Sequence, residues 1–203
     1  MKKTTQPVKI GLTGGIASGK TTAQKAFEAL GVPCIDHDKL ARDVVAAGSK
    51  GLKQLVSQFG QSILTENQEL NRPALKEIIF NNPEAKKEVE GIIHPLVFEA
   101  SESIIEKHSD APYILIVSPL LIESGSAKNM HKLVVVDIPR DIQLQRLLSR
   151  DGMSETLANS IIASQATPEQ RHAAADYILD NNGSLEELRM AAQKCHQDLL
   201  KTL

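Results

Sequence analysis

The residues best suited to chemistry form one short stretch near the start of the chain. Residues 14–21 read GGIASGKT and match the phosphate-binding pattern G-x-x-x-x-G-K-[ST] at every fixed position. Successive backbone N–H groups of such a loop turn inward to form an anion cradle, and its glycines let the chain approach the phosphates. We expect Lys20 to reach the β- and γ-phosphates of a nucleotide and the Thr21 hydroxyl to ligate Mg²⁺. The nucleotide contacts we predict are Gly15, Ala17, Ser18, Gly19, Lys20, Thr21 and Thr22.

Residue 17 is the unusual position in this loop, because Ala17 stands where many such loops carry glycine. If the backbone there needs positive φ, alanine costs roughly 1 kcal/mol relative to glycine. A glycine-rich turn that binds nothing is the alternative explanation of the stretch. The completeness of the pattern, placed between a strand and a helix, argues against it.

The segments on either side of the loop must position it. Residues 8–12 are a short apolar run typical of a strand, and residues 22–30 carry apolar side chains on one face, which predicts an amphipathic helix. Gly31 should end that helix. Its amino terminus, with unbonded N–H groups and partial positive charge, would then face the same phosphate oxygens.

Four further apolar runs predict the other strands of a sheet. They lie at 32–35, 113–117, 133–137 and 177–179. Their alternation with helical segments predicts an α/β fold, a parallel sheet of about five strands with helices on both faces. Ligands of such sheets bind at the carboxyl ends of the strands, so we expect the loop to share one edge with Asp36, Ser118 and Asp180.

The middle of the chain interrupts this alternation. Residues from 39 to 108 are mostly helical in pattern and contain no strand candidate, which predicts an inserted helical lobe. Within it, Gly48 and Gly51 should separate two helices, and Pro95 should kink or break a helix that otherwise runs to Lys107. The polar segment after residue 150 has the composition of a lid. We divide this single domain into a core at 8–38, 111–150 and 174–203, a helical acceptor-binding lobe at about 39–109 and a lid at about 150–171.

Two capping boxes mark helix starts late in the chain. One begins at Thr167 and the other at Ser184. The second opens a final helix whose inner face is predicted to carry Leu185, Leu188, Ala192, Cys195 and Leu199.

Composition excludes several classes of partner. The net charge of −2 gives no general attraction to nucleic acid or to an anionic membrane, and the absence of Trp with only four Phe and two Tyr argues against stacking of single-stranded bases. Cys34 and Cys195 are expected to be free, buried thiols. The longest apolar runs are too short to cross a bilayer, and no signal-peptide core follows the basic start of the chain, so we expect a cytoplasmic location.

Two carboxylates follow the second predicted strand. Asp36 and Asp38 lie where the acceptor of a phosphoryl group should sit, and a positioned carboxylate can take the proton of an attacking hydroxyl. The alternative is a helix cap. We expect one aspartate to act as base and the other to cap the helix or order a Mg²⁺-bound water, and the spacing alone leaves open which does which.

Basic residues gather before the predicted lid. Arg146 and Arg150 are four apart and share a helix face, with Arg140 upstream. Guanidinium groups can bind phosphate or stack on adenine, although a solvated basic face would look the same. Asp137 ends an apolar run and is expected mainly as a structural strand end, with assistance to Mg²⁺ as the alternative. His94 is expected to support the kink at Pro95 or, less simply, to contact the acceptor.

These motifs together resemble the dephospho-coenzyme A kinase family. The resemblance spans nearly the whole chain and is carried by pieces in family order. They are residues 12–21, Ile-Asp-x-Asp at 35–38, Ala41-Arg42, Leu70-Asn71-Arg72, His-Pro-Leu at 94–96, Pro-Leu-Leu-x-Glu at 119–123, Arg150-Asp151-Gly152, Ala163-Ser164-Gln165 and the stretch 175–183 containing Asp-Asn-x-Gly.

The resemblance implies a P-loop kinase that transfers the γ-phosphate of ATP to the ribose 3′-hydroxyl of dephospho-coenzyme A, with Mg²⁺. Asp38 matches the favoured general base, with Asp36 as its partner, and Lys20 and Arg146 complete the implied catalytic set. The implied substrate contacts are Thr13, Asp38, Arg42, Arg72, His94, Pro119 and Leu120. The implied nucleotide contacts beyond the loop are Arg146, Arg150 and Asn181.

Three positions depart from the family pattern. Ala17 replaces the usual glycine, His37 replaces a small residue between the aspartates, and Ile161 stands where many members have arginine. Any role of that arginine in the lid is then absent here, and Arg146 and Arg150 would carry more of that role.

Other functions remain to be weighed against this resemblance. A small-molecule kinase with a different acceptor would differ in the helical lobe. A nucleotide-hydrolysing switch of the guanine-reading kind would need an Asn-Lys-x-Asp segment after a late strand, and the sequence has none. The acidic balance and few aromatics disfavour a nucleic-acid-dependent ATPase.

Overall fold

The computed structural model describes residues 6–80 and 82–203, and the basic start of the chain lies outside them. By chain contacts it divides into two compact units, one built from the segments up to Ile35 and from His108 to Leu203, the other from Asp36–Lys107. The strands are β1 (Val8–Gly14), β2 (Cys34–Asp36), β3 (Tyr113–Val117), β4 (Lys132–Asp137) and β5 (Tyr177–Asp180). The helices are α1 (Lys20–Ala29), α2 (His37–Asp43), α3 (Lys50–Phe59), α4 (Arg72–Phe80), α5 (Pro83–Lys107), α6 (Arg140–Asp151), α7 (Glu155–Ala163), α8 (Pro168–Ala174) and α9 (Leu185–Thr202), with short 3₁₀ turns at Gln61–Ile63 and Ser126–Asn129.

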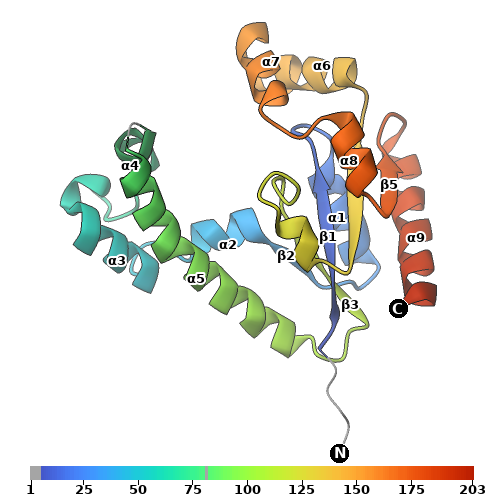
Figure 1. Ribbon diagram of the computed structural model, residues 1–203, viewed down its shortest axis with the longest axis horizontal. Coiled ribbons are helices and arrows are strands. Elements are labelled where there is room, and N and C mark those ends of the chain that lie inside the picture. The colour runs from blue at the N-terminus through green and yellow to red at the C-terminus, as the bar shows by residue number, and fades with distance from the viewer. Residues whose placement is uncertain (1–5, 81) are drawn as a thin grey trace, which may run out of the picture. The chain divides into compact units, whose positions relative to one another are not determined.

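The sheet has five strands in the order β2-β3-β1-β4-β5 (Figure 1). β1 is central and pairs in parallel with β3 on one side and β4 on the other, and β4 pairs in parallel with β5. The predicted α/β fold class is confirmed. Each predicted strand is present, with ends that differ by up to two residues from the apolar runs, because backbone pairing and not side-chain hydropathy sets where a strand ends.

Helices α1 and α9 cover one face of this sheet. The side chains of Ala23 and Phe27 from α1 pack with strand residues such as Ile10 and Val134. From α9, the predicted inner-face residues Leu188, Ala192, Cys195 and Leu199 are buried there, as expected. Leu185 is the exception, because it occupies the first turn of α9 and is 60% exposed.

The opposite face is covered by irregular segments and by α8. Leu133 and Val135 of β4 pack against Leu121, which follows β3. Helix α8, which precedes β5 in the chain, contacts β4. Both capping boxes form as predicted, at Thr167 for α8 and at Ser184 for α9, so the ends of these two helices are set locally.

The second unit is helical. Its core combines residues of α3, α4 and α5 with the connections between them, including Val45, Leu55, Ile63, Leu75 and Val89. In the described residues the nearest approach to a strand is a single antiparallel bridge between Leu64 and Leu70.

The expectation for Gly51 was wrong, and of the two alternatives for Pro95, a kink or a break, the break was wrong. Gly51 does not separate helices: it lies in the first turn of α3, where a Cβ would collide with the carbonyl oxygen of Val44. Helix α3 instead begins after Ser49, whose side chain caps it. Pro95 does not break α5, which continues from Pro83 to Lys107. Buried residues on both sides of the proline, such as Val89 and Ile105, hold the two halves in place despite the lost hydrogen bond.

Candidate active site

The loop between β1 and α1 is organised by its carbonyl groups. The carbonyl oxygen of Gly15 accepts from the Ser18 amide, and that of Gly19 accepts from the amides of Thr22 and Ala23. The three carbonyls between them accept from side chains of distant residues. Every carbonyl from residue 15 to residue 19 therefore accepts a hydrogen bond, and the three from Ile16 to Ser18 accept it from outside the loop.

Three side chains from two segments, α6 and the residues after β5, hold these middle carbonyls. Gln143 Nε2 donates to the Ile16 oxygen at 2.7 Å, Arg146 Nη1 to the Ala17 oxygen at 3.2 Å, and Asn181 Nδ2 to the Ser18 oxygen at 2.6 Å. The C=O and N–H of one peptide group point in opposite directions, so the Ile16 and Ser18 carbonyls, held by these side chains, leave the Ala17 and Gly19 amides turned away from them.

Ala17 takes the left-handed conformation that the missing glycine would favour. Its φ is +58°, so the expected strain is present. Gly19 has φ +94°, which strains any other residue, and a Cβ there would displace Asn181 Nδ2 from its place.

The start of α1 completes the anion site. The residue before the helix, Gly19, provides no side-chain cap, so the first N–H groups of α1 remain available. Lys20 and Thr22 are half-buried and Thr21 is exposed. Ser18 differs from this group, since its side chain is buried and its hydroxyl has no partner among the described residues.

Arg146 and Asn181 connect two loops of the core. Besides Ala17, Arg146 binds the carbonyl oxygen of Asn181 through Nη2 at 3.1 Å. Asn181 is 5% exposed, and its amide donates to the Asp137 carbonyl. Sequence reasoning selected both residues, and the structure brings both to the loop.

Arg150 lies away from these contacts. Its guanidinium forms a bidentate ion pair with the neighbouring Asp151, which raises the pKa of Arg150 and lowers that of Asp151. Arg140 binds Asn159 of α7. The three arginines of α6 therefore have three different sets of partners, although Arg146 and Arg150 were predicted to share a helix face.

Asp137 contacts two basic side chains of the protein. Its Oδ1 accepts from Arg171 Nη2 at 2.8 Å, and its Oδ2 lies 2.7 Å from His172 Nε2. Arg171 is 6% exposed. These contacts fit the structural role that we expected for Asp137 at the end of β4.

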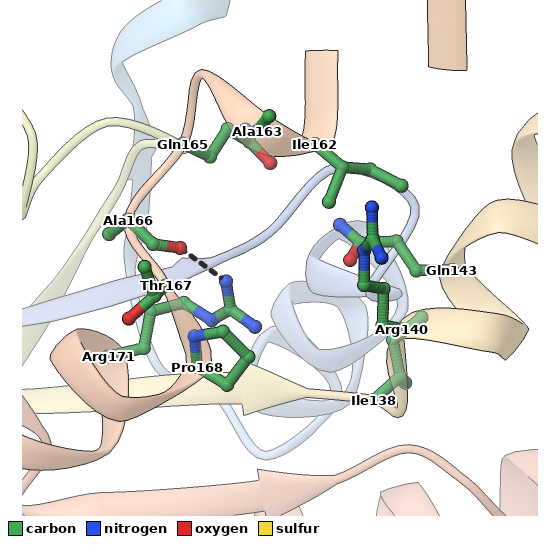
Figure 2. A pocket seen from close by; sticks show the side chains of 10 residues that line it. All are labelled: Ile138, Arg140, Gln143, Ile162, Ala163, Gln165, Ala166, Thr167, Pro168 and Arg171. Atoms are coloured by element: carbon green, nitrogen blue, oxygen red, sulfur yellow. Dashed lines mark hydrogen bonds between the residues drawn. The ribbon is translucent and has the colours of Figure 1, made fainter. Parts of the chain in front are cut away.

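A cavity of about 330 Å³ lies beside the loop, between β4 and the helices from α6 to α8. Figure 2 shows Arg140 and Gln143 on one side of it and Arg171 on the other. The Arg171 Nη1 donates to the Ala166 carbonyl at 2.7 Å, the dashed line in the figure.

The helical unit carries the two aspartates. Asp36 is the residue before α2, and its Oδ1 accepts from the Lys39 amide at 3.0 Å, so the expected cap is confirmed and belongs to Asp36. Asp38 lies in the first turn of α2 and is exposed. His37 Nε2, between them, lies 3.5 Å from Ser101 Oγ of α5.

The other predicted acceptor contacts are distributed over both units. Arg42 lies in the last turn of α2, Arg72 begins α4, and His94 is an exposed residue of the continuous α5. In the sheet unit, Thr13 is buried in β1, while Leu120, after Pro119, is 49% exposed beyond β3.

Sequence reasoning missed several polar residues at the loop. Gln143 and Arg171 were not selected, and Gln165 and Glu123 were only quoted within motifs. Gln165 Oε1 accepts from the Ile16 amide at 2.8 Å, and Glu123 Oε1 accepts from the Ala166 amide at 2.8 Å. A buried glutamine on an amphipathic helix is the one signal that could have marked Gln143.

A glycine-rich cradle between the central strand of a parallel sheet and an uncapped helix defines the class of P-loop kinases and related nucleotide-binding enzymes. The family model for dephospho-CoA kinase matches residues 8–187. The chain belongs to the dephospho-CoA kinase family, whose members phosphorylate dephospho-coenzyme A with ATP in the last step of coenzyme A biosynthesis.

Individual relatives agree with this assignment. A dephospho-CoA kinase of Pseudoalteromonas translucida is 40% identical over 193 residues, which cover 95% of this chain and 91% of that protein. Among solved structures, one from Thermus thermophilus matches with a TM-score of 0.79 and 30% identity, covering 96% of this chain and 99% of that one. A dephospho-CoA kinase from Campylobacter jejuni matches with a TM-score of 0.66 and 27% identity, covering 96% and 98%. No helix within the described ranges has the length and apolarity needed to span a membrane.

Proposed function

We propose that this chain transfers the γ-phosphoryl group of ATP to the ribose 3′-hydroxyl of dephospho-coenzyme A, using the loop at residues 14–21 as its phosphate site. The observation that carries the proposal is that every carbonyl from Gly15 to Gly19 is engaged, with those of Ile16, Ala17 and Ser18 held by side chains of α6 and of the segment after β5. A cradle whose amides are already oriented need not reorganise when phosphate enters, which favours binding and transition-state stabilisation.

Each residue of the cradle has a proposed task. Backbone amides of the loop and of the first turn of α1 bind phosphate oxygens, and the Lys20 ammonium stabilises the charge on the transferring group. Arg146 keeps the loop in place and adds positive charge beside the nucleotide. Arg150 becomes available to ATP only if it leaves its pair with Asp151.

Mg²⁺ fits the donors of this site. Among the described residues no group of three His, Cys, Asp or Glu side chains could hold a metal, but kinases bind Mg²⁺ largely through nucleotide phosphates. The exposed Thr21 hydroxyl at the start of α1 would be the protein ligand. Bound there, Mg²⁺ would neutralise developing phosphate charge.

The two aspartates are the residues proposed to activate the acceptor hydroxyl. Asp38 is proposed as the base that takes the proton of the 3′-hydroxyl as the hydroxyl oxygen bonds to the γ-phosphorus and the bond to ADP breaks. Asp36 would be its partner, and its cap on α2 fixes the backbone from which Asp38 projects. We assign the acceptor to the helical lobe, about 39–109, with Arg42, Arg72 and His94, and further contacts to Thr13, Pro119 and Leu120.

The lid is proposed to lie within about 150–171 and to exclude water during transfer. A cytoplasmic location is proposed too. Both cysteines are free in the structure, as thiols are in a reducing compartment.

The direct test is ADP formation from ATP and Mg²⁺ with and without dephospho-coenzyme A. Adenosine monophosphate and shikimate serve as control acceptors. We expect ADP only with dephospho-coenzyme A, together with coenzyme A as product. ADP formed with a control acceptor, or no acceptor-dependent ADP from folded protein that binds ATP, would overturn the proposed acceptor.

A further inference from the structure

We propose that Gln143 and Gln165 are positioning residues that hold the two peptide groups on either side of Ile16, and so set the phosphate-binding loop for ATP. This inference rests on the proposed function of the loop. It adds two residues, one from α6 and one from the connection between α7 and α8, that touch the loop backbone from the side of the lid.

The two contacts have opposite polarity. The Ile16 amide can only donate, and its partner is Gln165 Oε1 at 2.8 Å. The Ile16 carbonyl can only accept, and its partner is Gln143 Nε2 at 2.7 Å. The backbone therefore fixes which end of each side-chain amide faces the loop.

Both glutamines are themselves held. Gln143 is 3% exposed. The residue after Gln165 is Ala166, whose amide donates to Glu123 and whose carbonyl accepts from the buried Arg171. The connection that carries Gln165 is thus anchored to two other parts of the sheet unit, and Figure 2 shows it lining the same cavity as Gln143.

The contacts of Gln143 and Gln165 with Ile16, called the clamp below, matter for ATP because of where they lie in the loop. Ile16 directly precedes Ala17, which is strained at φ +58° and would relax if its neighbours were free to turn. Holding the residue-16 amide and carbonyl at once restricts that rotation. Because the loop is ordered before ATP arrives, binding does not have to supply that ordering.

The polarity suggests a matched pair of variants, Gln143→Glu and Gln165→Glu. Each adds one negative charge at nearly the same place. Glutamate at 165 still offers an oxygen to the Ile16 amide, whereas glutamate at 143 sets an oxygen against the Ile16 carbonyl. We expect Gln143→Glu to raise the Kd and KM for ATP about tenfold more than Gln165→Glu does, with the KM for dephospho-coenzyme A changed less than about twofold in both.

Several outcomes would overturn the inference. Equal effects of the two variants would mean that charge alone acts, and no effect in either would mean that the clamp is dispensable. If Gln143→Glu does not fold, the neutral pair Gln143→Met and Gln165→Met decides: each should raise the KM for ATP about threefold or more, and unchanged values would refute the clamp.

Lys20→Ala, measured beside them, separates this failure from that of the proposed function. If Lys20→Ala loses ATP binding while Gln143→Glu and Gln165→Glu raise the Kd and KM for ATP equally, only the proposed role of the two glutamines is refuted. Wild-type ATP affinity in Lys20→Ala removes the phosphate site, and the clamp with it.

Discussion

Arg146 binds the carbonyl oxygen of Asn181 while each of the two residues also binds a carbonyl of the phosphate loop. Arg146 takes the oxygen of Ala17, and Asn181 takes that of Ser18. One side of the loop is therefore fixed by a triangle of contacts between α6, the segment after β5 and the loop itself.

Replacing Arg146 by lysine should weaken this triangle, because an ammonium cannot reproduce the two-pronged geometry of a guanidinium. Hydrogen bonds from charged groups contribute about 1.5–3 kcal/mol, so we expect kcat/KM for ATP to fall about ten- to hundredfold. Steady-state kinetics would measure it, with the exposed neighbour Gln145→Ala as a control on the same helix. A lysine variant as active as that control would contradict the assignment.

The two aspartates should separate in kinetics. Asp38→Asn removes the proposed base and should lower kcat about a hundredfold or more. Asp36→Asn should lower kcat less, because asparagine caps helices about as well as aspartate and α2 would still begin at the same residue. Asp43→Asn, at the exposed end of α2, controls for a lost charge. A larger loss in Asp36→Asn than in Asp38→Asn would reverse the two roles.

Ala17→Gly should stabilise the fold. Relief of the left-handed conformation contributes about 1–2 kcal/mol, and the greater freedom of glycine in the unfolded chain offsets about 0.4–1 kcal/mol of it. The Tm should therefore rise by about 2 °C. The matched change Ala173→Gly, in helix α8, should have the opposite sign. A lower Tm for Ala17→Gly would show that the methyl group packs favourably.

The free energy of unfolding should decrease as the pH falls, because His196 is harder to protonate in the folded chain than in the unfolded one. Burial lowers the pKa of His196 below 6.5 in the folded chain, where its Nδ1 lies 2.6 Å from the Tyr113 hydroxyl. The unfolded state then binds more protons, so this contribution is complete above pH 6.5 and is lost as the pH falls toward the lower folded pKa.

Urea unfolding at pH 7.5 and 5.5 would measure this loss. His196→Asn keeps a hydrogen-bonding group and removes the titration, so it should show a smaller difference between the two pH values. The exposed His108→Asn should keep the wild-type difference. Identical pH dependence in all three proteins would exclude His196 as the source.

Neither cysteine should react readily in the folded protein. Burial raises the pKa of both Cys34 and Cys195 to about 12, which leaves about one thiol in ten thousand ionised at pH 8. Iodoacetamide should modify both quickly in urea and neither quickly in buffer, as intact mass would show, with glutathione as a reactive reference. Fast labelling of either residue in buffer would contradict the burial.

Local signals were read correctly from the chain. The loop pattern, the apolar strands, the capping boxes at Thr167 and Ser184 and the left-handed strain at Ala17 all follow from residues adjacent in sequence. Errors arose where packing overrides local preference. Gly51 was read as a helix breaker and Pro95 as a residue that kinks or breaks its helix, but packing of their neighbours keeps α3 and α5 continuous.

The sequence by itself determined where phosphate should bind, because a P-loop is specified by glycines, a lysine and a hydroxyl within eight positions. Only the tertiary structure decided what holds that loop. The partners of Ile16 and Ser18 lie between 127 and 163 positions away along the chain. Helix periodicity could at most have marked Gln143 as an inward-facing glutamine. Its partner stays hidden, since the contact exists only after β4 has paired with β1 and β5 with β4.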